Sequence, residues 1–384
     1  MINESNLLRI PGPSPIPPSI QRAMSQPMIG HRGAETSEMM RRIKPELKKV
    51  FGTKQDVMII TGSGTSGLET AAVNVAGEGD EVLVLVSGSF GDRFAKICEE
   101  YKMKTHRIEV EWGDEIVVED VTHFLKENKN IKAVFMTHCE TSTGILNPIA
   151  DISKAIQENS EALVIVDGVS CVGGVETEMD AWGVDVFVTG SQKAMMLPAG
   201  LAFIAVSDKA WEVIDANEQS RFYLDLRRYR DNLEKDTTPF TPALSLIFGL
   251  EQALKLMNEE GLENVYARHT LMKNMTRAAM RALNIPLLTE DNVASATVTA
   301  VKPDTFEAEA LRKSVKTNFG LSLAGGQAHL KGEIFRIGHM GFCTPADVLQ
   351  YLGIIELGLK DIGADIELGA GVRAAQEVYL EQNN

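Results

Sequence analysis

The run Leu163-Val164-Ile165-Val166 is apolar at four consecutive positions and leads directly into Asp167-Gly168. A strand with one solvated face alternates apolar and polar residues. This run therefore predicts a strand buried on both faces, as in a parallel sheet covered by helices. Four more runs have the same character, namely Val57–Ile60, Val82–Val86, Ala133–Met136 and Val184–Val188.

Longer amphipathic stretches lie between these runs and predict helices over Leu68–Ala76, Asp92–Tyr101, Glu119–Glu127 and Ile149–Asn159. Buried strands that alternate with helices form βαβ units, whose crossovers make neighbouring strands parallel. We therefore expect an α/β fold with a mainly parallel, doubly wound sheet flanked by helices.

The pattern changes after about residue 245. Two long helices are expected there, at Leu246–Met257 and Glu263–Leu283. A smaller α+β pattern follows, with expected strands and helices at Ala296–Val301, Phe306–Asn318, Ile334–Ile337 and Pro345–Asp361. A length of 384 residues is enough for about two domains. The predicted division is an N-terminal arm over residues 1–25, a large domain over residues 26–264 and a small C-terminal α+β domain over residues 265–384.

The composition excludes some classes of partner and indicates a cellular compartment. With 38 Lys and Arg against 53 Asp and Glu, the net charge is −15, which argues against nucleic acid or an anionic membrane surface as a partner. No apolar run approaches the ~18–20 residues that span a bilayer, and the N-terminus lacks the pattern of a signal peptide. The four cysteines form no CxxC pair, so we expect no metal site and a cytoplasmic location.

The segment Gly62-Ser63-Gly64-Thr65-Ser66-Gly67 lies between an expected strand and an expected helix. Its glycines allow close approach of a ligand, and the free amide groups and dipole of a helix N-terminus favour an anion. A capping box over Ser66–Glu69 is the purely structural alternative. The segment also matches the dinucleotide fingerprint. That reading requires an acidic residue where the second strand ends, and Ser87-Gly88 stands there instead. A single phosphate is therefore favoured over the cofactor of a nicotinamide dehydrogenase.

Asp167 stands at the carboxyl end of a buried strand, and Lys193 follows the next strand in Gly190-Ser191-Gln192-Lys193. Ligands of open α/β sheets bind at that edge. The small or apolar residues that follow Lys193 are expected to desolvate its amine, which lowers its pKa and makes it a better nucleophile.

A phosphate cradle, a strand-end aspartate and a desolvated lysine together are what pyridoxal phosphate requires. The phosphate needs donors, the pyridine nitrogen needs an acidic partner, and the aldehyde needs a lysine amine. An aromatic residue should also stack on the ring, and Phe90 is the candidate.

The chain resembles the class V pyridoxal-phosphate aminotransferases, in particular the serine–pyruvate and alanine–glyoxylate branch. The resemblance runs from about residue 8 to about residue 360. Its matching segments, in order, are Pro11-Gly12-Pro13, Gly62-Ser63-Gly64-Thr65, residues 137–144 (THCETSTG), Val166-Asp167, Gly190-Ser191-Gln192-Lys193 and Phe335-Arg336-Ile337-Gly338.

The resemblance implies a fold-type I pyridoxal-phosphate transferase and a role for each matching residue. Lys193 would carry the cofactor and move the proton, and Asp167 would pair with the pyridine nitrogen. Phe90 stands where the family often has a tryptophan on the ring. Thr141 would lie near the ring oxygen, and the phosphate would be held by Ser63, Gly64, Thr65 and Gln192. The substrate would be bound by Arg336, whose guanidinium suits a carboxylate, and by Gly12 of the arm.

The resemblance also implies a homodimer with shared active sites. In the family the partner completes the phosphate site with a tyrosine and a threonine. The corresponding stretch here, residues 236–242, has no tyrosine and leaves Thr238 or Thr241 for this role. The arm over residues 7–18 is expected to pack on the neighbouring subunit. His31 and Arg32 lie either near the substrate entrance or in a structural loop.

The implied reaction is transamination between a small amino acid, alanine or serine, and a small 2-oxo acid, glyoxylate or pyruvate. A transaminase for a phosphonate or a phosphorylated amino acid is the alternative, with an additional cation from His31, Arg32 or Lys331. A cysteine desulfurase-like lyase is disfavoured because the loop at residues 325–327 has no cysteine. A non-catalytic binding protein is disfavoured because the lysine, aspartate and arginine are all present.

Overall fold

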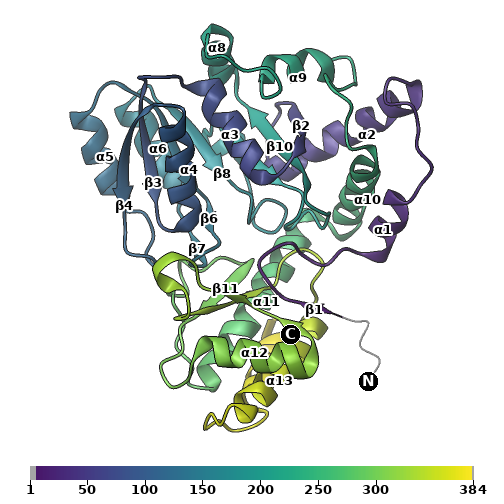
Figure 1. Ribbon diagram of the computed structural model, residues 1–384, viewed down its shortest axis with the longest axis vertical. Helices are drawn as coiled ribbons and strands as arrows, with labels where there is room; N and C mark the ends of the chain where they lie inside the picture. The colour runs from purple at the N-terminus through teal and green to yellow at the C-terminus, as the bar shows by residue number, and fades with distance from the viewer. Residues whose placement is uncertain (1–5, 383–384) are drawn as a thin grey trace.

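The computed structural model describes residues 6–382. The chain forms a larger α/β body and a smaller body beneath it, with the N-terminal arm crossing between the two (Figure 1). A seven-stranded sheet forms the centre of the larger body. Its strands, in spatial order, are β2 (Val57–Gly62), β10 (Gly200–Val206), β9 (Val186–Gly190), β8 (Leu163–Asp167), β5 (Ile131–Thr137), β3 (Glu81–Val86) and β4 (Lys104–Glu109).

The sheet confirms the predicted mainly parallel arrangement, because β10 alone among the seven strands runs antiparallel to its neighbours. All five predicted strands belong to it. Two further strands escaped prediction, β10 and the edge strand β4. The sequence of β4 is largely polar and its residues are half-buried or exposed, so it lacks the continuous apolar run of a central strand.

Helices cover the sheet as the βαβ pattern predicted. They include α4 (Ser89–Glu100), α5 (Val118–Glu127) and α6 (Ile149–Asn159). Helix α3 (Gly64–Val75) begins four residues before the predicted start at Leu68. Its N-cap is Ser63, whose Oγ accepts from the Ser66 amide at 3.3 Å, and Ser66 lies in the first turn. The alternative of a capping box starting at Ser66 is therefore wrong, and the glycine-rich segment itself opens the helix.

The other helices of the larger body complete its layers, and short strands close its loops. The helices are α1 (Pro18–Met24), α2 (Ala34–Phe51), α7 (Met179–Trp182), α8 (Asp208–Ala216), α9 (Leu226–Leu233) and α10 (Leu244–Glu260). The short strands are β6 (Cys139–Glu140) and β7 (Ile145–Leu146).

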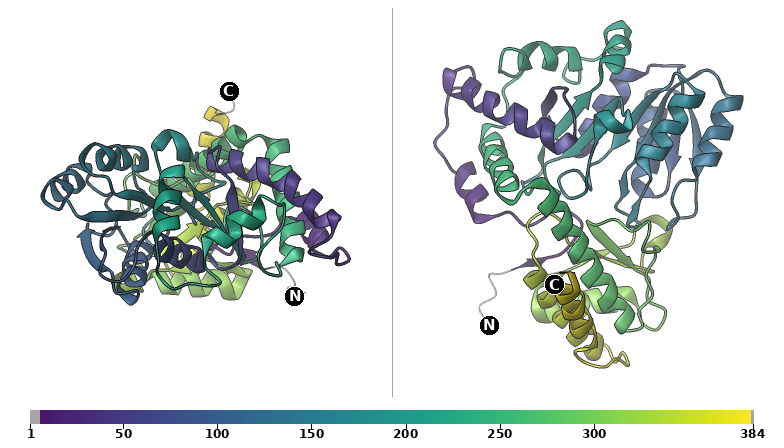
Figure 2. Two further views of the ribbon diagram at one scale, coloured as in Figure 1. Left: turned by 90° about the horizontal axis from the view of Figure 1, so that it is seen from above. Right: turned by 180° about the vertical axis from the view of Figure 1, so that it is seen from behind.

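The smaller body has its own antiparallel sheet, in the order β11 (Val298–Val301), β14 (Phe335–Gly338), β13 (Ala324–Gly325). Around it lie α12 (Ala308–Phe319), β12 (Leu321–Ser322), the 3-10 turn η1 (Ala328–Leu330), α13 (Pro345–Asp361) and α14 (Ala370–Gln382). Helix α11 (Leu262–Ala282) runs from the larger body down into the smaller one (Figure 2). One large hydrophobic cluster has its buried members between residues 20 and 257, and a second has them between residues 272 and 375. The predicted boundary at residue 265 falls within α11 and stays a prediction.

The N-terminal arm lies on its own chain. Strand β1 (Leu7–Leu8) pairs in parallel with β12, and the Gly338 amide donates to the Arg9 carbonyl at 2.7 Å. Further along, the Ser14 amide donates to the Gln192 carbonyl at 3.0 Å. These contacts attach the arm to edges of its own chain, and the expected packing of the arm on a neighbouring subunit stays a prediction.

Within residues 6–382 no helix combines the length and the apolar character needed to cross a lipid bilayer.

Three buried histidines predict how the stability of the fold depends on pH. Burial lowers the pKa of His138 to about 4 and that of His269 and His339 to about 3, from a usual value of 6.5. Below pH 6.5 these histidines bind protons in the unfolded chain but stay neutral in the folded chain. The free energy of unfolding should therefore decrease as the pH falls from about 6.5 to about 4. Each histidine contributes up to about 1.4 kcal/mol per pH unit.

Urea unfolding at a series of pH values measures this dependence. His339→Gln should reduce the slope of stability against pH, whereas His123→Gln should not, because the His123 side chain is 77% exposed. A free energy of unfolding that stays constant between pH 6.5 and pH 5 would contradict the prediction.

Candidate active site

Two adjacent strand ends bring the predicted aspartate and lysine together. Strands β8 and β9 are parallel neighbours, with Asp167 paired in register with Val188, so both end at one edge of the sheet. Asp167 is the last residue of β8, and Lys193 stands in the loop that follows β9. Their side chains are almost fully buried, with Asp167 2% exposed and Lys193 7% exposed. Lys193 is therefore held out of water, as its apolar neighbours predicted.

The arm covers the amine of Lys193. Its Nζ donates a hydrogen bond to the Pro11 carbonyl, and Ser14 Oγ donates to the Lys193 carbonyl at 2.7 Å. A Cβ at Gly12 would lie 2.5 Å from Lys193 Cδ and 2.8 Å from Nζ. Burial lowers the pKa of Lys193 to about 8, although the charge of Asp167 acts in the opposite direction. A substantial fraction of this amine is thus neutral near physiological pH.

The carboxyl group of Asp167 has an environment that suits a cationic partner. Its Oδ1 accepts from the Val169 amide at 2.8 Å. Burial raises the pKa of Asp167 to about 7, well above the usual 3.8. A positively charged nitrogen placed beside it would stabilise the ionised carboxylate and lower that pKa again.

The N-terminus of α3 is the segment that the sequence predicts to hold an anion. Ser63 and Thr65 are exposed there, Gly64 is buried, and the first amide groups of the helix have no partner within it. A Cβ at Gly190 would lie 3.3 Å from the Gly64 Cα and 2.9 Å from Gln192 Oε1, so Gln192 lies against the same cradle. Gln192 Oε1 is buried without a hydrogen-bond partner among the described residues.

Phe90 lies beside the lysine, at the beginning of α4, with its ring centroid 6.0 Å from Lys193 Nζ. Its position is held by Glu140, a fully buried residue from β6. Glu140 Oε2 accepts from the Phe90 and Gly91 amides, both at 3.0 Å, and Oε1 accepts from the Ser142 amide at 3.0 Å. Glu140 belongs to the matching segment at residues 137–144, and no feature of the sequence indicated this structural role.

Arg336 approaches the same site from the smaller body. It is 5% exposed, and its guanidinium donates to the Thr141 carbonyl at 2.8 Å and twice to the Gly325 carbonyl at 3.0 and 2.7 Å. Three of its five N–H donors are thus used by backbone, and two remain for a ligand. Thr141 Oγ1 bonds with the Ser170 hydroxyl.

The two candidate threonines of the predicted shared site differ in how exposed their side chains are. Thr238 is 7% exposed and donates its hydroxyl hydrogen to the Phe240 carbonyl at 2.7 Å. Thr241 is exposed. Of the two, only Thr241 presents a side chain that another molecule can reach.

The cations named for an additional anionic group differ in their exposure and in their partners. Arg32 is exposed and binds the backbone carbonyls of Thr238 and Pro239, and Lys331 is exposed after η1. His31 is half-buried in the turn before α2. The four cysteines are all buried and unpaired. Among residues 6–382 no group of three or more His, Cys, Asp or Glu side chains could hold a metal ion.

One cation that sequence reasoning missed is close to this site. Arg93 lies on α4 with its Cζ 4.7 Å from the Phe90 ring centroid, and its Nη1 is 3.4 Å from Thr65 Oγ1. The only sequence signal for it was the spacing of three residues after Phe90, which places both on one face of a helix.

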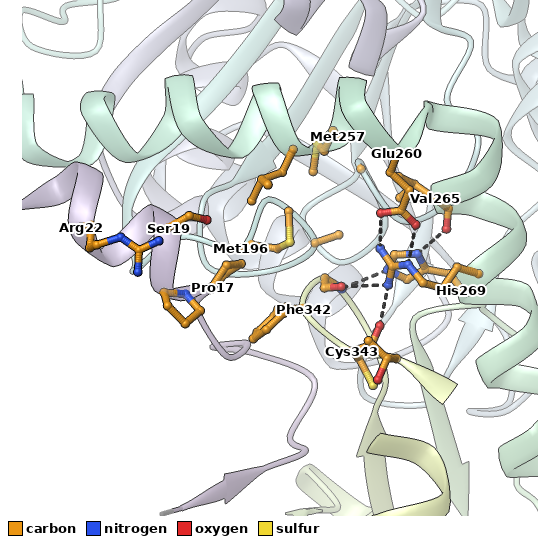
Figure 3. Close-up of a pocket in the computed structure, with 17 residues that line it drawn as sticks. Pro17, Ser19, Arg22, Met196, Met257, Glu260, Val265, His269, Phe342 and Cys343 are labelled. Atoms are coloured by element: carbon orange, nitrogen blue, oxygen red, sulfur yellow. Dashed lines mark hydrogen bonds and ion pairs between the residues drawn. The ribbon is translucent and has the colours of Figure 1, made fainter. Parts of the chain in front are cut away.

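A cavity of about 530 Å³ lies on the far side of the lysine loop, between α1, α10, α11 and residues 341–344 (Figure 3). Ala194 and Met196 line it, but the side chains of Lys193, Asp167 and Arg336 do not. Arg268 pairs with Glu260 in its wall and donates to the Gly341 and Cys343 carbonyls at 3.0 and 2.6 Å (Figure 3). These contacts fix the loop that follows the strand of Arg336.

The close approach of Gly12 to Lys193 predicts the effect of a substitution. Gly12 has a φ of +114°, and a Cβ there would clash with the lysine side chain. Gly12→Ala should therefore lower the free energy of unfolding by about 2–4 kcal/mol, from backbone strain and overpacking together. Gly79→Ala is the matched control, because Gly79 has a φ of +85° with no atom within 4 Å of the added Cβ. Equal losses in the two variants, measured by urea unfolding, would show that the contact with Lys193 is unimportant.

Comparison with known proteins agrees with this geometry. The family model described as aminotransferase class-V matches residues 19–344. A serine–glyoxylate aminotransferase of Hyphomicrobium methylovorum is 37% identical over 385 residues, which cover 98% of this chain and 95% of that one. A protein named soluble hydrogenase, small subunit, of a Synechococcus species is 43% identical over 380 residues, covering 98% of this chain and 99% of that one.

A solved structure matches over nearly the whole length. The ureidoglycine–glyoxylate aminotransferase of Bacillus subtilis superimposes with a TM-score of 0.93 at 31% identity, covering 99% of both chains. The family match, the identities and this fold agree with the buried lysine and aspartate at the sheet edge. The chain belongs to the class V aminotransferases, enzymes of fold type I that depend on pyridoxal phosphate.

Proposed function

We propose that the protein catalyses transamination between a small amino acid, alanine or serine, and a small 2-oxo acid, glyoxylate or pyruvate. The observation that carries the proposal is the convergence of Lys193, Asp167 and Arg336 on one buried site covered by the arm. The glyoxylate in the names of two relatives supports the acceptor. The hydrogenase name of the Synechococcus relative is not carried over, because these residues match transamination.

The residues of the site fit pyridoxal phosphate. The first amide groups of α3 have no partner within the helix, and the side-chain amide nitrogen of Gln192, which lies beside them, can donate a hydrogen bond to an anion. We propose that Ser63, Gly64, Thr65 and Gln192 hold the phosphate, that Asp167 holds the pyridine nitrogen and that Phe90 packs on the ring near Thr141. The bound cofactor supplies an electron sink for the charge left when a proton leaves the substrate Cα.

Lys193 is the proposed proton carrier. Its pKa of about 8 means that the amine can both accept and return a proton near neutral pH, which is the condition for efficient acid–base catalysis. Its contact with the Pro11 carbonyl keeps Nζ at one place under the arm. In each half-reaction the Nζ would take the proton from the substrate Cα and deliver it to the other reacting carbon.

Arg336 is the proposed clamp for the substrate carboxylate. Its guanidinium is fixed by the Thr141 and Gly325 carbonyls, so binding a carboxylate with its two remaining donors needs little further ordering. The arm limits the space for a substrate beside Lys193, because Pro11 and Gly12 contact that lysine directly. A small side chain on the substrate fits this restriction best.

We further propose a cytoplasmic homodimer with shared active sites. The four cysteines are unpaired, as is usual in a reducing compartment. Phe222 is 65% exposed and Tyr223 is 40% exposed, and both rings pack on Phe240 near the exposed Thr241. Such an aromatic surface suits a second copy of the chain, whose phosphate site Thr241 would complete.

A reduction experiment tests the cofactor and the lysine together. The purified protein should be yellow, and borohydride should fix pyridoxal phosphate covalently to Lys193, as peptide mass spectrometry would show. Lys193→Ala should abolish both the fixation and turnover without unfolding the chain. A protein that takes up no pyridoxal phosphate would refute the proposal.

Arg336→Gln tests the carboxylate clamp. Loss of the ionic hydrogen bonds should raise KM for alanine or serine about 10- to 100-fold. The absorption of the bound cofactor should stay unchanged, because Arg336 acts on the substrate. Arg373→Gln is the control, since that arginine pairs with Glu367 at 3.2 Å and its side chain is 59% exposed. Steady-state kinetics over a panel of amino donors with glyoxylate and pyruvate would measure the effect and identify the preferred pair.

A further inference from the structure

Arg93 contacts two parts of the site, the Phe90 ring and the N-terminus of α3. Its guanidinium lies over the Phe90 ring, with 4.7 Å between Cζ and the ring centroid, and its Nη1 donates to Thr65 Oγ1 at 3.4 Å. Thr65 belongs to the N-terminus of α3, the proposed phosphate cradle. The aromatic face orients the guanidinium by a cation–π contact and directs its donors toward the cradle.

Arg93 also differs from the neighbouring cations in having no acidic partner. Lys96, on the same helix, pairs with Asp92 at 2.6 Å, and Arg107 pairs with Asp92, Glu99 and Glu109. No carboxylate lies within ion-pairing distance of Arg93 in the described part of the chain. A half-buried cation without an acidic partner, beside a helix N-terminus, forms a site that favours an anion.

The charge balance of the cradle requires such a cation. A phosphate monoester carries a charge of about −1.5 to −2 at neutral pH, whereas a helix N-terminus offers only about +0.5. Lys193 and Arg336 are assigned to the aldehyde and to the substrate carboxylate. The field of a chain with a net charge of −15 opposes anion binding, so a local cation has to compensate.

We propose that Arg93 is a ligand of the cofactor phosphate, acting together with the amide groups of Gly64 and Thr65. This inference rests on the proposed function. The planar guanidinium can donate two parallel hydrogen bonds to phosphate oxygens while its other face stays on Phe90. Arg93 would then neutralise the phosphate and hold the Phe90 ring in the same arrangement. The position of Arg93 supports this, because its charge also lowers the pKa of both Asp167 and Lys193.

The test compares Arg93→Gln with Lys96→Gln, each prepared without cofactor. Pyridoxal phosphate, pyridoxal and inorganic phosphate serve as probes, with binding followed by absorbance for the first two and by calorimetry for the last. Arg93→Gln should weaken binding of pyridoxal phosphate about 10- to 100-fold and should weaken binding of pyridoxal far less, because pyridoxal has no phosphate. The affinity of Arg93→Lys for pyridoxal phosphate should lie between those of the wild-type protein and Arg93→Gln. Raising the ionic strength should reduce the difference in affinity between the wild-type protein and Arg93→Gln. Lys96→Gln should bind all three probes like the wild-type protein, since Lys96 pairs with Asp92.

Each other outcome would overturn the inference in a recognisable way. Equal losses for pyridoxal phosphate and pyridoxal would mean that Arg93 acts only through Phe90. Unchanged cofactor binding with a raised KM for dicarboxylic donors alone would make Arg93 a substrate residue. A wild-type protein that binds no pyridoxal phosphate would refute the proposed function, and inorganic phosphate would still test Arg93. Equal phosphate affinity in wild type and Arg93→Gln would then refute the inference as well.

Discussion

The structure depends on keeping one amine, that of Lys193, out of water at the carboxyl edge of a parallel sheet. Desolvation of an ammonium group is costly, and here it lowers the pKa to about 8. Two arrangements make the burial tolerable. Parallel strands β8 and β9 end side by side and bring the charge of Asp167 near. The arm returns across the site, and the Pro11 carbonyl accepts a hydrogen bond from Nζ. A solvated lysine would be fully protonated and could not act as a base.

Local donors explain how a strongly acidic protein can bind two anionic groups. The net charge of −15 is spread over the whole chain, whereas the site collects the N-terminus of α3, Arg93 and Arg336. Each is held by contacts of its own, with Arg336 on the Thr141 carbonyl and Arg93 on the Phe90 ring. Preorganised donors lose little entropy on binding, so a few of them outweigh a diffuse and screened opposing field.

Much of the fold and of the site could be predicted because the patterns that reveal them are local. Five of the seven strands of the large sheet have nearly continuous apolar runs, and the three residues Asp167, Lys193 and Arg336 lie within recognisable segments. The start of α3 was placed too late because glycines disfavour helix, and only the fold shows that their amides open it. Strand β4 was missed because an edge strand does not need an apolar run. Hydrophobic periodicity was enough to predict the class of fold. The start of α3 and the presence of β4 depend on contacts between distant segments.

The sequence by itself determined the class of fold and the chemical groups of the site, since hydrophobic periodicity and residue type are properties of short segments. Tertiary structure decided which groups meet. It folded the arm over its own Lys193, left Thr241 exposed and Thr238 internally bonded, and set Glu140 beneath the amides of Phe90 and Gly91. It also brought Arg93 next to Thr65, across 28 residues of sequence. Such distant pairs depend on how strands and helices pack, and no local pattern carries that information.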